Sequence, residues 1–321
     1  MTKKIIALLA MMVMLLTGCE NSQLNKPSDS TALSEPIVED ISNTPNMVVN
    51  RVNFKIGLDE TKAVMNNDTL QIPLKLNGDE GCENVGIKVF IDGIQQEFSP
   101  DNSDDYSFNN TLCIKTDDTP YELKIKAKFD EDIETHTISA VSIYNPDFVP
   151  QPGVSLGLNH KCAAGGFRVL PITDTQLEFS DSKVVLEAPA PTPITNEQME
   201  KYDLKGENSE AFLLMQNYGE NTYSLDENGS NLSLEFVAGT QTAGKEEYRV
   251  SFYKNHELVS FNGEYLYLDI SSEGGKISIT DITIDNVKAG DFLYCIIVPT
   301  ASFNEFAFAK KTVTTVVVNA Q

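Results

Sequence analysis

Residues 121–129 have the sequence Tyr121-Glu122-Leu123-Lys124-Ile125-Lys126-Ala127-Lys128-Phe129. Apolar and charged side chains alternate along this whole stretch. Successive side chains of a β-strand point to opposite faces of a sheet, so an alternating strand buries one face and leaves the other in water. The pattern favours a half-buried antiparallel strand over a helix, whose apolar positions recur every three or four residues. We therefore expect a fold built from strands.

The alternation continues on both sides of this stretch, from residue 51 to residue 145. About seven alternating segments follow one another there, separated by turn-forming residues. Asp92-Gly93 lies between two of these segments and predicts a two-residue hairpin turn, because such turns favour residues that tolerate positive φ. Pro73 lacks the N–H that a ladder hydrogen bond needs, which predicts an edge position for the strand over residues 70–76.

Several short antiparallel strands within about 100 residues are the signature of an immunoglobulin-like β-sandwich. On this basis we assign residues 51–145 to a first sandwich. Turn-forming residues and prolines at 145–152 predict a boundary, and residues 153–320 contain further strand segments. The expected fold class is therefore all-β, with two antiparallel immunoglobulin-like β-sandwich regions, of which the second has extra N-terminal strands.

One short helix is expected inside the second region. Thr195 and Gln198 have the spacing of a capping box, in which each side chain accepts a hydrogen bond from the backbone N–H of the other residue. The helix is predicted over residues 196–202. It directly follows the proline-rich stretch 188–193, which cannot join a central sheet.

The N-terminus has a separate pattern. Lys3 and Lys4 precede an unbroken apolar run over residues 5–16, and Leu16-Thr17-Gly18-Cys19 follows. A run of this length is well short of the roughly 20 residues that span a bilayer, which predicts a cleaved export signal. The stretch resembles a bacterial lipoprotein signal peptide with its lipobox.

This resemblance implies that residues 1–18 are removed and that Cys19 carries acyl chains that hold the protein on a membrane of the bacterial cell envelope, facing outward. An ordinary secretory signal with an incidental Cys19 is the alternative. Residues 19–50 are rich in Ser, Thr, Asn, Pro, Asp and Glu without an apolar period. Such a composition cannot bury enough apolar surface to fold, so we expect a lipid anchor followed by a disordered tether.

The chain is strongly acidic. It has 24 Lys and Arg against 47 Asp and Glu, a formal charge of −23, which becomes −25 when Lys3 and Lys4 leave with the signal. Phosphate recognition needs clustered Lys and Arg, so this balance excludes nucleic-acid binding and disfavours anionic headgroups. It favours solubility, a cationic partner or weak binding of divalent cations.

Four cysteines follow Cys19, at positions 82, 113, 162 and 295. An exported chain meets a disulfide-permissive compartment, where four cysteines allow three pairings. The pairing of Cys82 with Cys113 and of Cys162 with Cys295 keeps each bridge within one predicted region. Four unpaired thiols are the alternative.

The sequence contains no recognisable catalytic set. The histidines are His136, His160 and His256, and the first and third are expected to face solvent. No nucleophile elbow, zinc-protease helix or phosphate loop is present. His160 and Cys162 supply two ligands where structural zinc needs four, so neither a metal site nor a cofactor is predicted. A glycosidase that uses a carboxylate pair stays open as an alternative, because acidic residues are abundant.

Tyr265 and Tyr267 are a candidate sugar-stacking platform. They lie two positions apart, which puts their rings about 6.6 Å apart on one face of a strand. We expect a membrane-anchored, surface-exposed lipoprotein with a non-catalytic binding or adhesion role towards an unknown protein or glycan. The alternative is a lipoprotein that binds carbohydrate or hydrolyses glycosides.

Overall fold

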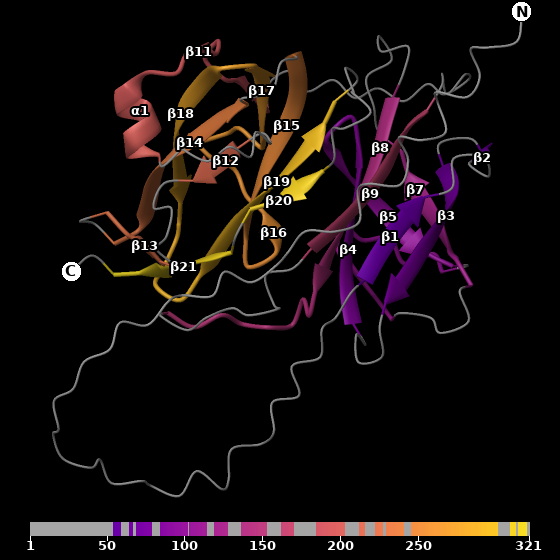
Figure 1. Cartoon of the computed structure of the whole chain (residues 1–321). Coiled ribbons are helices and arrows are strands. Elements are labelled where there is room, and N and C mark those ends of the chain that lie inside the picture. Colours follow the sequence, from indigo (N-terminus) through magenta and orange to yellow (C-terminus); the bar gives the residue numbers. More distant parts are fainter. Residues whose placement is uncertain are drawn as a thin grey trace, which may run out of the picture. The chain divides into compact units, whose positions relative to one another are not determined.

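The structure is a computed structural model, and it is drawn in Figure 1. It divides into two units, residues 1–49 and 50–321. The residues described below all belong to the second unit; the predicted signal peptide, Cys19 and tether lie outside them. They are 54–58, 64–66, 69–78, 84–101, 103–113, 119–127, 136–152, 162–169, 184–202, 212–215, 222–226, 229–240, 245–300, 309–312 and 314–319.

The first sheet system has nine antiparallel strands. Their order is β1-β3-β7-β5-β4-β8-β9, with β2 paired to β3 and β6 paired to β4. The bounds are β1 Phe54–Leu58, β2 Val64–Asn66, β3 Thr69–Gly78, β4 Asn84–Ile91, β5 Ile94–Pro100, β6 Asn110–Cys113, β7 Tyr121–Lys126, β8 His136–Tyr144 and β9 Cys162–Val169.

Strand β5 joins the two halves of this system. Its residues 94–96 pair with β4, whereas residues 97–100 pair with β7. The halves enclose one apolar core, to which β3 contributes Ile72, β4 contributes Ile87 and β7 contributes Leu123. The strand quoted first, β7, has the expected alternation of buried and partly or fully exposed residues. This part of the chain is therefore a β-sandwich, as predicted.

The second system consists of two sheets. One has the order β10-β17-β15-β19-β21-β13, with β16 on β15 and β20 on β19, and the other has the order β11-β18-β14-β12. The bounds are β10 Val185–Glu187, β11 Thr192–Pro193, β12 Phe212–Met215, β13 Thr222–Ser224, β14 Asn231–Thr240, β15 Lys245–Lys254, β16 Glu257–Leu258, β17 Tyr267–Glu273, β18 Lys276–Asp285, β19 Phe292–Pro299, β20 Lys310–Lys311 and β21 Thr315–Val318.

The core of this second sandwich is built around aromatic rings. Phe252 meets Phe236 at 5.8 Å and Phe261 at 5.1 Å between ring centroids, both edge to face. Two short edge strands, β10 and β13, pair parallel to their neighbours, and the remaining pairs are antiparallel. The predicted all-β class with packed antiparallel sheets is confirmed.

A further apolar layer lies between the two sandwiches. The outer face of β4 and β8 packs against the outer face of β15 and β19. Because β19 also lines the inner core, all of its residues are buried. A strand buried on both faces has a continuous apolar sequence, which explains the run at residues 292–299. The layer consists of Phe90, Val141, Ile143, Tyr253, Phe292, Tyr294, Ile296 and Val298.

Helix α1, Asn196–Lys201, covers the outer face of the four-stranded sheet, where Tyr202 packs against Val237 and Ile277 (Figure 1). Its first turn has the predicted capping box: Thr195 accepts from the N–H of Gln198, and Gln198 accepts from the N–H of Thr195. The predicted helix is confirmed. Within the described residues, no helix is long and apolar enough to cross a membrane.

Two expectations about strands differ from the structure. Strand β3 is not an edge strand, because β7 pairs on one side and β1 and β2 pair on the other. Pro73 is tolerated since it lies between the end of the β1 pairing at Leu74 and the start of the β2 pairing at Gln71. Strand β9 pairs with β8 and so belongs to the first sheet system, although the sequence pattern had placed it in the second.

Candidate functional site

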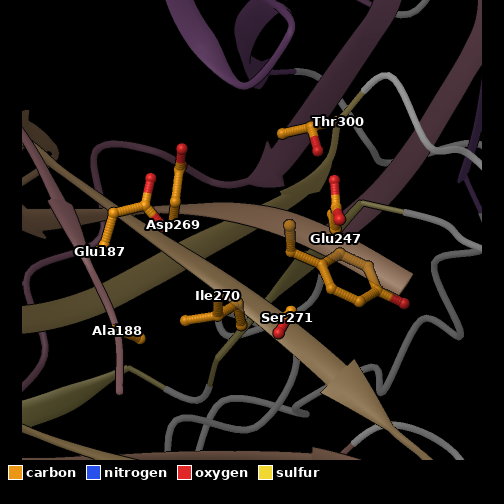
Figure 2. A pocket seen from close by; sticks show the side chains of 8 residues that line it. Glu187, Ala188, Glu247, Asp269, Ile270, Ser271 and Thr300 are labelled. Atoms are coloured by element: carbon orange, nitrogen blue, oxygen red, sulfur yellow. The ribbon is translucent and has the colours of Figure 1, made fainter. Parts of the chain in front are cut away.

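A pocket of about 370 Å³ opens beside the edge of the eight-stranded sheet. Three carboxylates line it, from Glu187 at the end of β10, Glu247 on β15 and Asp269 on β17. Figure 2 shows Glu187 and Asp269 side by side, with Glu247 next to Thr300. The remaining lining residues are Ala188, Tyr248, Ile270 and Ser271.

The strand pairing explains why these acids converge. Strand β10 runs parallel to β17 and aligns Glu187 with Asp269, and β15 runs antiparallel to β17 on its other side. The backbone N–H of Ala188 donates to the carbonyl of Asp269 at 2.8 Å, and that of Thr300 donates to the carbonyl of Glu247 at 3.0 Å. Three strands therefore hold the pocket walls in place.

Asp269 is neutralised by Arg249. Nε and Nη2 of the guanidinium donate to the two carboxylate oxygens at 2.6 and 2.7 Å, a bidentate pair. Burial opposes the charge of Arg249, but the hydrogen bonds and charge of Asp269 outweigh it and raise the pKa of Arg249. With Glu187 and Glu247 beside this pair, the acidic groups of the pocket lining outnumber the one guanidinium next to it, so the pocket is negative.

Crowding among the acids affects Glu187 most. Partial burial, and then the charge of Asp269, raise the pKa of the Glu187 carboxyl, although Arg249 acts against the shift. A positive group placed in the pocket would reduce this repulsion, whereas an anion would add to it. The pocket is thus suited to an ammonium or guanidinium group.

Carboxylates and the hydroxyls of Tyr248, Ser271 and Thr300 are the polar side-chain groups of the pocket. Its lining residues include no histidine, cysteine or lysine. Among the described residues, no group of three or more His, Cys, Asp or Glu side chains is placed to hold a metal ion. Asp269 is held by Arg249, and Glu187 and Glu247 are the other two carboxylates of the lining.

Arg249 also links the pocket to the first sandwich. Its Nη1 donates to the backbone carbonyl of Asp92, at the tip of the β4–β5 hairpin, at 3.1 Å. Asp92 is buried, and its carboxylate lies 2.5 Å from Nδ1 of His136 and accepts from the N–H of Thr137 at 2.8 Å. The predicted Asp92-Gly93 turn is confirmed, since both residues have positive φ. The turn is a docking point between the sandwiches.

The two described histidines do not face solvent as expected. His136 is 3% exposed and bound to Asp92. His256 lies in the β15–β16 hairpin turn, with its ring 4.9 Å from that of Phe292. The sequence could not reveal this, because the partners come from distant segments: Asp92 for His136, and Lys88 of the first sandwich for His256. Burial, and then the charge of Lys88, lower the pKa of His256 to about 4.

This shift predicts a pH dependence of stability. The unfolded chain protonates His256 near its ordinary pKa of 6.5, but the folded protein does so only near 4, so stability should fall as pH drops from 6.5 to 4. Over this range we expect the free energy of unfolding to fall in both proteins. The fall should be on the order of 1 kcal/mol smaller for His256→Asn than for the wild type, after allowance for solvent screening. Asparagine suits the φ of +70° at this position.

Urea unfolding at both pH values measures this difference. The absolute stability of the variant is irrelevant, because only the change between the two pH values is compared. Equal losses in both proteins would contradict the assignment.

The two tyrosines proposed as a sugar platform lie apart. Tyr267 is 4% exposed, and its hydroxyl accepts from the N–H of Gln95 at 3.3 Å. Tyr265 packs on Phe261 at the core of the second sandwich. They do not share a face, because Tyr265 precedes β17 and does not follow its alternation. The predicted platform is not formed in this structure.

Cys113, Cys162 and Cys295 lie among the described residues, whereas Cys82 does not. Cys295 has a free thiol inside the second core, where burial raises its pKa to about 12. The expected bridge to Cys162 is therefore not present. Cys162 begins β9 of the first sheet system, whereas Cys295 points into the core of the second sandwich. Cys113 is exposed and Cys82 lies outside the described residues, so that pairing stays a prediction.

Reasoning from sequence missed the pocket acids. Glu187, Glu247 and Asp269 come from three separate segments among 47 acidic residues, and no spacing singles them out. The parallel pairing of β10, which brings Glu187 beside Asp269, has no sequence signal because β10 has only three residues.

Comparison with known proteins gives distant structural likeness. No family model matches the sequence, and no curated protein matches it. Similar solved structures include a marsupial T cell receptor (9% identity, TM-score 0.21, covering 81% of this chain and 95% of the receptor chain). A bacterial ice-binding adhesin retained at a host cell surface has 10% identity and a TM-score of 0.20, covering 83% and 65%. Red sea bream transglutaminase has 10% identity and a TM-score of 0.20, covering 84% and 32%.

This chain thus spans slightly less than two thirds of the adhesin chain. It spans about a third of the transglutaminase chain. Superpositions with TM-scores near 0.2 carry no argument, so the fold class rests on the strands described above.

Proposed function

We propose that this protein is a membrane-anchored, surface-exposed bacterial lipoprotein with a non-catalytic binding or adhesion role. Acyl chains on Cys19 would hold it in the cell envelope, facing outward, and residues 20–50 would tether the sandwiches. Its ligand is an unidentified protein or glycan. Nucleic acid is an unsuitable partner because of the formal charge of −23.

The observation that carries the binding role is the pocket lined by Glu187 and Glu247. It is concave, it is held by three paired strands, and it gathers the carboxylates of Glu187, Glu247 and Asp269 without a histidine. Such a site has the negative charge to recognise a cationic ligand. A lysine or arginine side chain of a protein partner, or an amino sugar of a glycan, has the required positive charge.

The alternative is a carbohydrate-binding or glycoside-hydrolysing lipoprotein. Burial of Tyr267 removes the aromatic platform that supported this alternative. Its remaining support is the carboxylates of the pocket, since glycosidases use carboxylate pairs. A glycan array with a turnover screen on the full-length protein separates the two functions. Hydrolysis of any glycoside would refute the non-catalytic role.

The pocket gives a specific prediction for binding. We expect the full-length protein to bind a short oligolysine peptide, and the Glu187→Gln/Glu247→Gln double variant to bind it about threefold to tenfold more weakly, because each exposed ion pair contributes roughly 0.2–1 kcal/mol. The difference should shrink as salt is added. Isothermal titration calorimetry measures both effects.

A matched control separates the pocket from the net charge. Glu122 and Glu264 are exposed and lie outside the pocket, so the Glu122→Gln/Glu264→Gln variant removes the same charge elsewhere. Equal weakening by both double variants would mean that the peptide binds through the overall negative charge of the protein, and it would contradict a role for the pocket.

A further inference from the structure

Lys88 is a lysine buried in the layer between the sandwiches. It lies on β4, two residues before Phe90 of that layer, and is 2% exposed. Its Nζ donates to the backbone carbonyl of His256 at 2.8 Å and lies 4.5 Å from the centroid of the Tyr253 ring. It also contacts Oδ1 of the Asn109 side chain. The amine is thus held against a carboxamide in an environment with little water.

Burial strongly disfavours the charged form of this amine. The loss of hydration lowers the pKa of Lys88 from 10.5 to about 7, even though the charge of Glu257 acts in the opposite direction. At neutral pH a large share of Lys88 therefore has a free lone pair. A neutral, desolvated lysine is the form that acts as a nucleophile.

Asn109 is held between Lys88 and an acid. Its backbone N–H donates to the hydroxyl of Ser107 at 3.1 Å, which fixes the turn before β6. Its Nδ2 donates to Oε1 of Glu257, the first residue of β16, at 3.2 Å. The carboxamide thus has an amine at its oxygen side and a carboxylate at its nitrogen, where the leaving group would form.

A small cavity lies next to these groups. It has a volume of about 40 Å³, and its lining includes Lys88, Asn109 and His256. A space of this size holds a molecule as small as water. Nε2 of His256 is buried there without a hydrogen-bond partner among the described residues. The site therefore has room for a small polar leaving group such as ammonia.

We propose that Lys88 and Asn109 form an intramolecular isopeptide bond, with Glu257 transferring the proton. Nζ of neutral Lys88 attacks Cγ of Asn109, the new Nζ–Cγ bond forms, and the Cγ–Nδ2 bond breaks. The carboxylate of Glu257 takes one proton from Nζ and gives it to Nδ2, which leaves as ammonia. One amine and one primary amide become one secondary amide and ammonia, so no oxidant or other co-reactant is required.

Proximity and desolvation both favour this step. Fixing two reactants in contact replaces a bimolecular encounter, which removes a large part of the barrier. The product also replaces a buried amine, which is costly to keep charged, by a neutral amide. The bond would join β4 to the turn before β6, directly under the hairpin of the second sandwich that carries Glu257.

Peptide mapping of the full-length protein by mass spectrometry tests the proposal directly. Trypsin normally cuts after Lys88, but it does not cut after an acylated lysine. The bonded protein should therefore give one peptide over residues 76–115, lighter by one ammonia, that does not fragment between Lys88 and Asn109. A succinimide at Asn109 also loses ammonia, but it leaves Lys88 open to trypsin. Complete cleavage after Lys88 in the wild-type protein would overturn the proposal.

Variants of Glu257 test its role. Glu257 is exposed, so Glu257→Gln should fold normally while losing the carboxylate that moves the proton. We expect this variant to show normal cleavage after Lys88 and no loss of ammonia. Glu264→Gln, which alters an exposed acid away from the site, should keep the bond. A bond formed fully in Glu257→Gln would exclude Glu257 as the proton carrier.

Discussion

Serine in place of Cys19 is expected to abolish acylation of the mature N-terminus and to remove the protein from the detergent phase after phase separation. A serine hydroxyl is not the thiol that forms the thioether to a diacylglycerol. Each buried methylene contributes about 0.8 kcal/mol to membrane binding, and one acyl chain alone binds only marginally, so stable attachment requires two or three chains. Losing them removes far more binding free energy than any surface contact of the folded unit could replace.

The mass of the N-terminal peptide and the fraction of protein in the detergent phase measure this effect. Cys113→Ser is the matched control, because Cys113 is exposed in β6 and lies far along the sequence from the proposed lipobox. It should leave the acyl chains in place. An unmodified Cys19 in the wild-type protein would refute the anchor and the proposed location.

Local patterns predicted local structure well. The alternation that starts at Tyr121 became β7, Tyr121–Lys126, with its apolar side chains in a core, and Asp92-Gly93 became a hairpin turn with positive φ at both residues. Thr195 and Gln198 formed the capping box of α1. Each of these signals depends only on residues that are close in the sequence, so the local sequence is enough to predict the local structure.

Contacts between distant segments were not predictable in this way. Strand β19 is continuously apolar, which indicates burial on both faces, but no pattern says that β4 and β8 supply the second face. The hydrogen bond from Lys88 to the backbone carbonyl of His256 depends on that packing. The pocket likewise depends on the pairing of three-residue β10 with β17. These features arise from tertiary packing, which overrides the local pattern.

Alanine in place of Gly93 is expected to destabilise the folded unit by roughly 2–5 kcal/mol, because two costs act at one residue. Gly93 has φ of +77°, a conformation that side chains disfavour. A Cβ there would also lie 2.4 Å from Cβ of Arg249, which is attached directly to the β15 backbone and cannot rotate away. The hairpin would have to lift from β15, which would strain the Arg249–Asp92 hydrogen bond between the sandwiches.

Gly229→Ala separates the two costs. Gly229 has φ of +69° but open space around its Cα, so this variant has the conformational cost without the clash. We expect Gly229→Ala to lose about 1 kcal/mol in urea unfolding, and Gly93→Ala to lose at least twice as much. Equal destabilisation by both variants would mean that the turn does not dock tightly on β15.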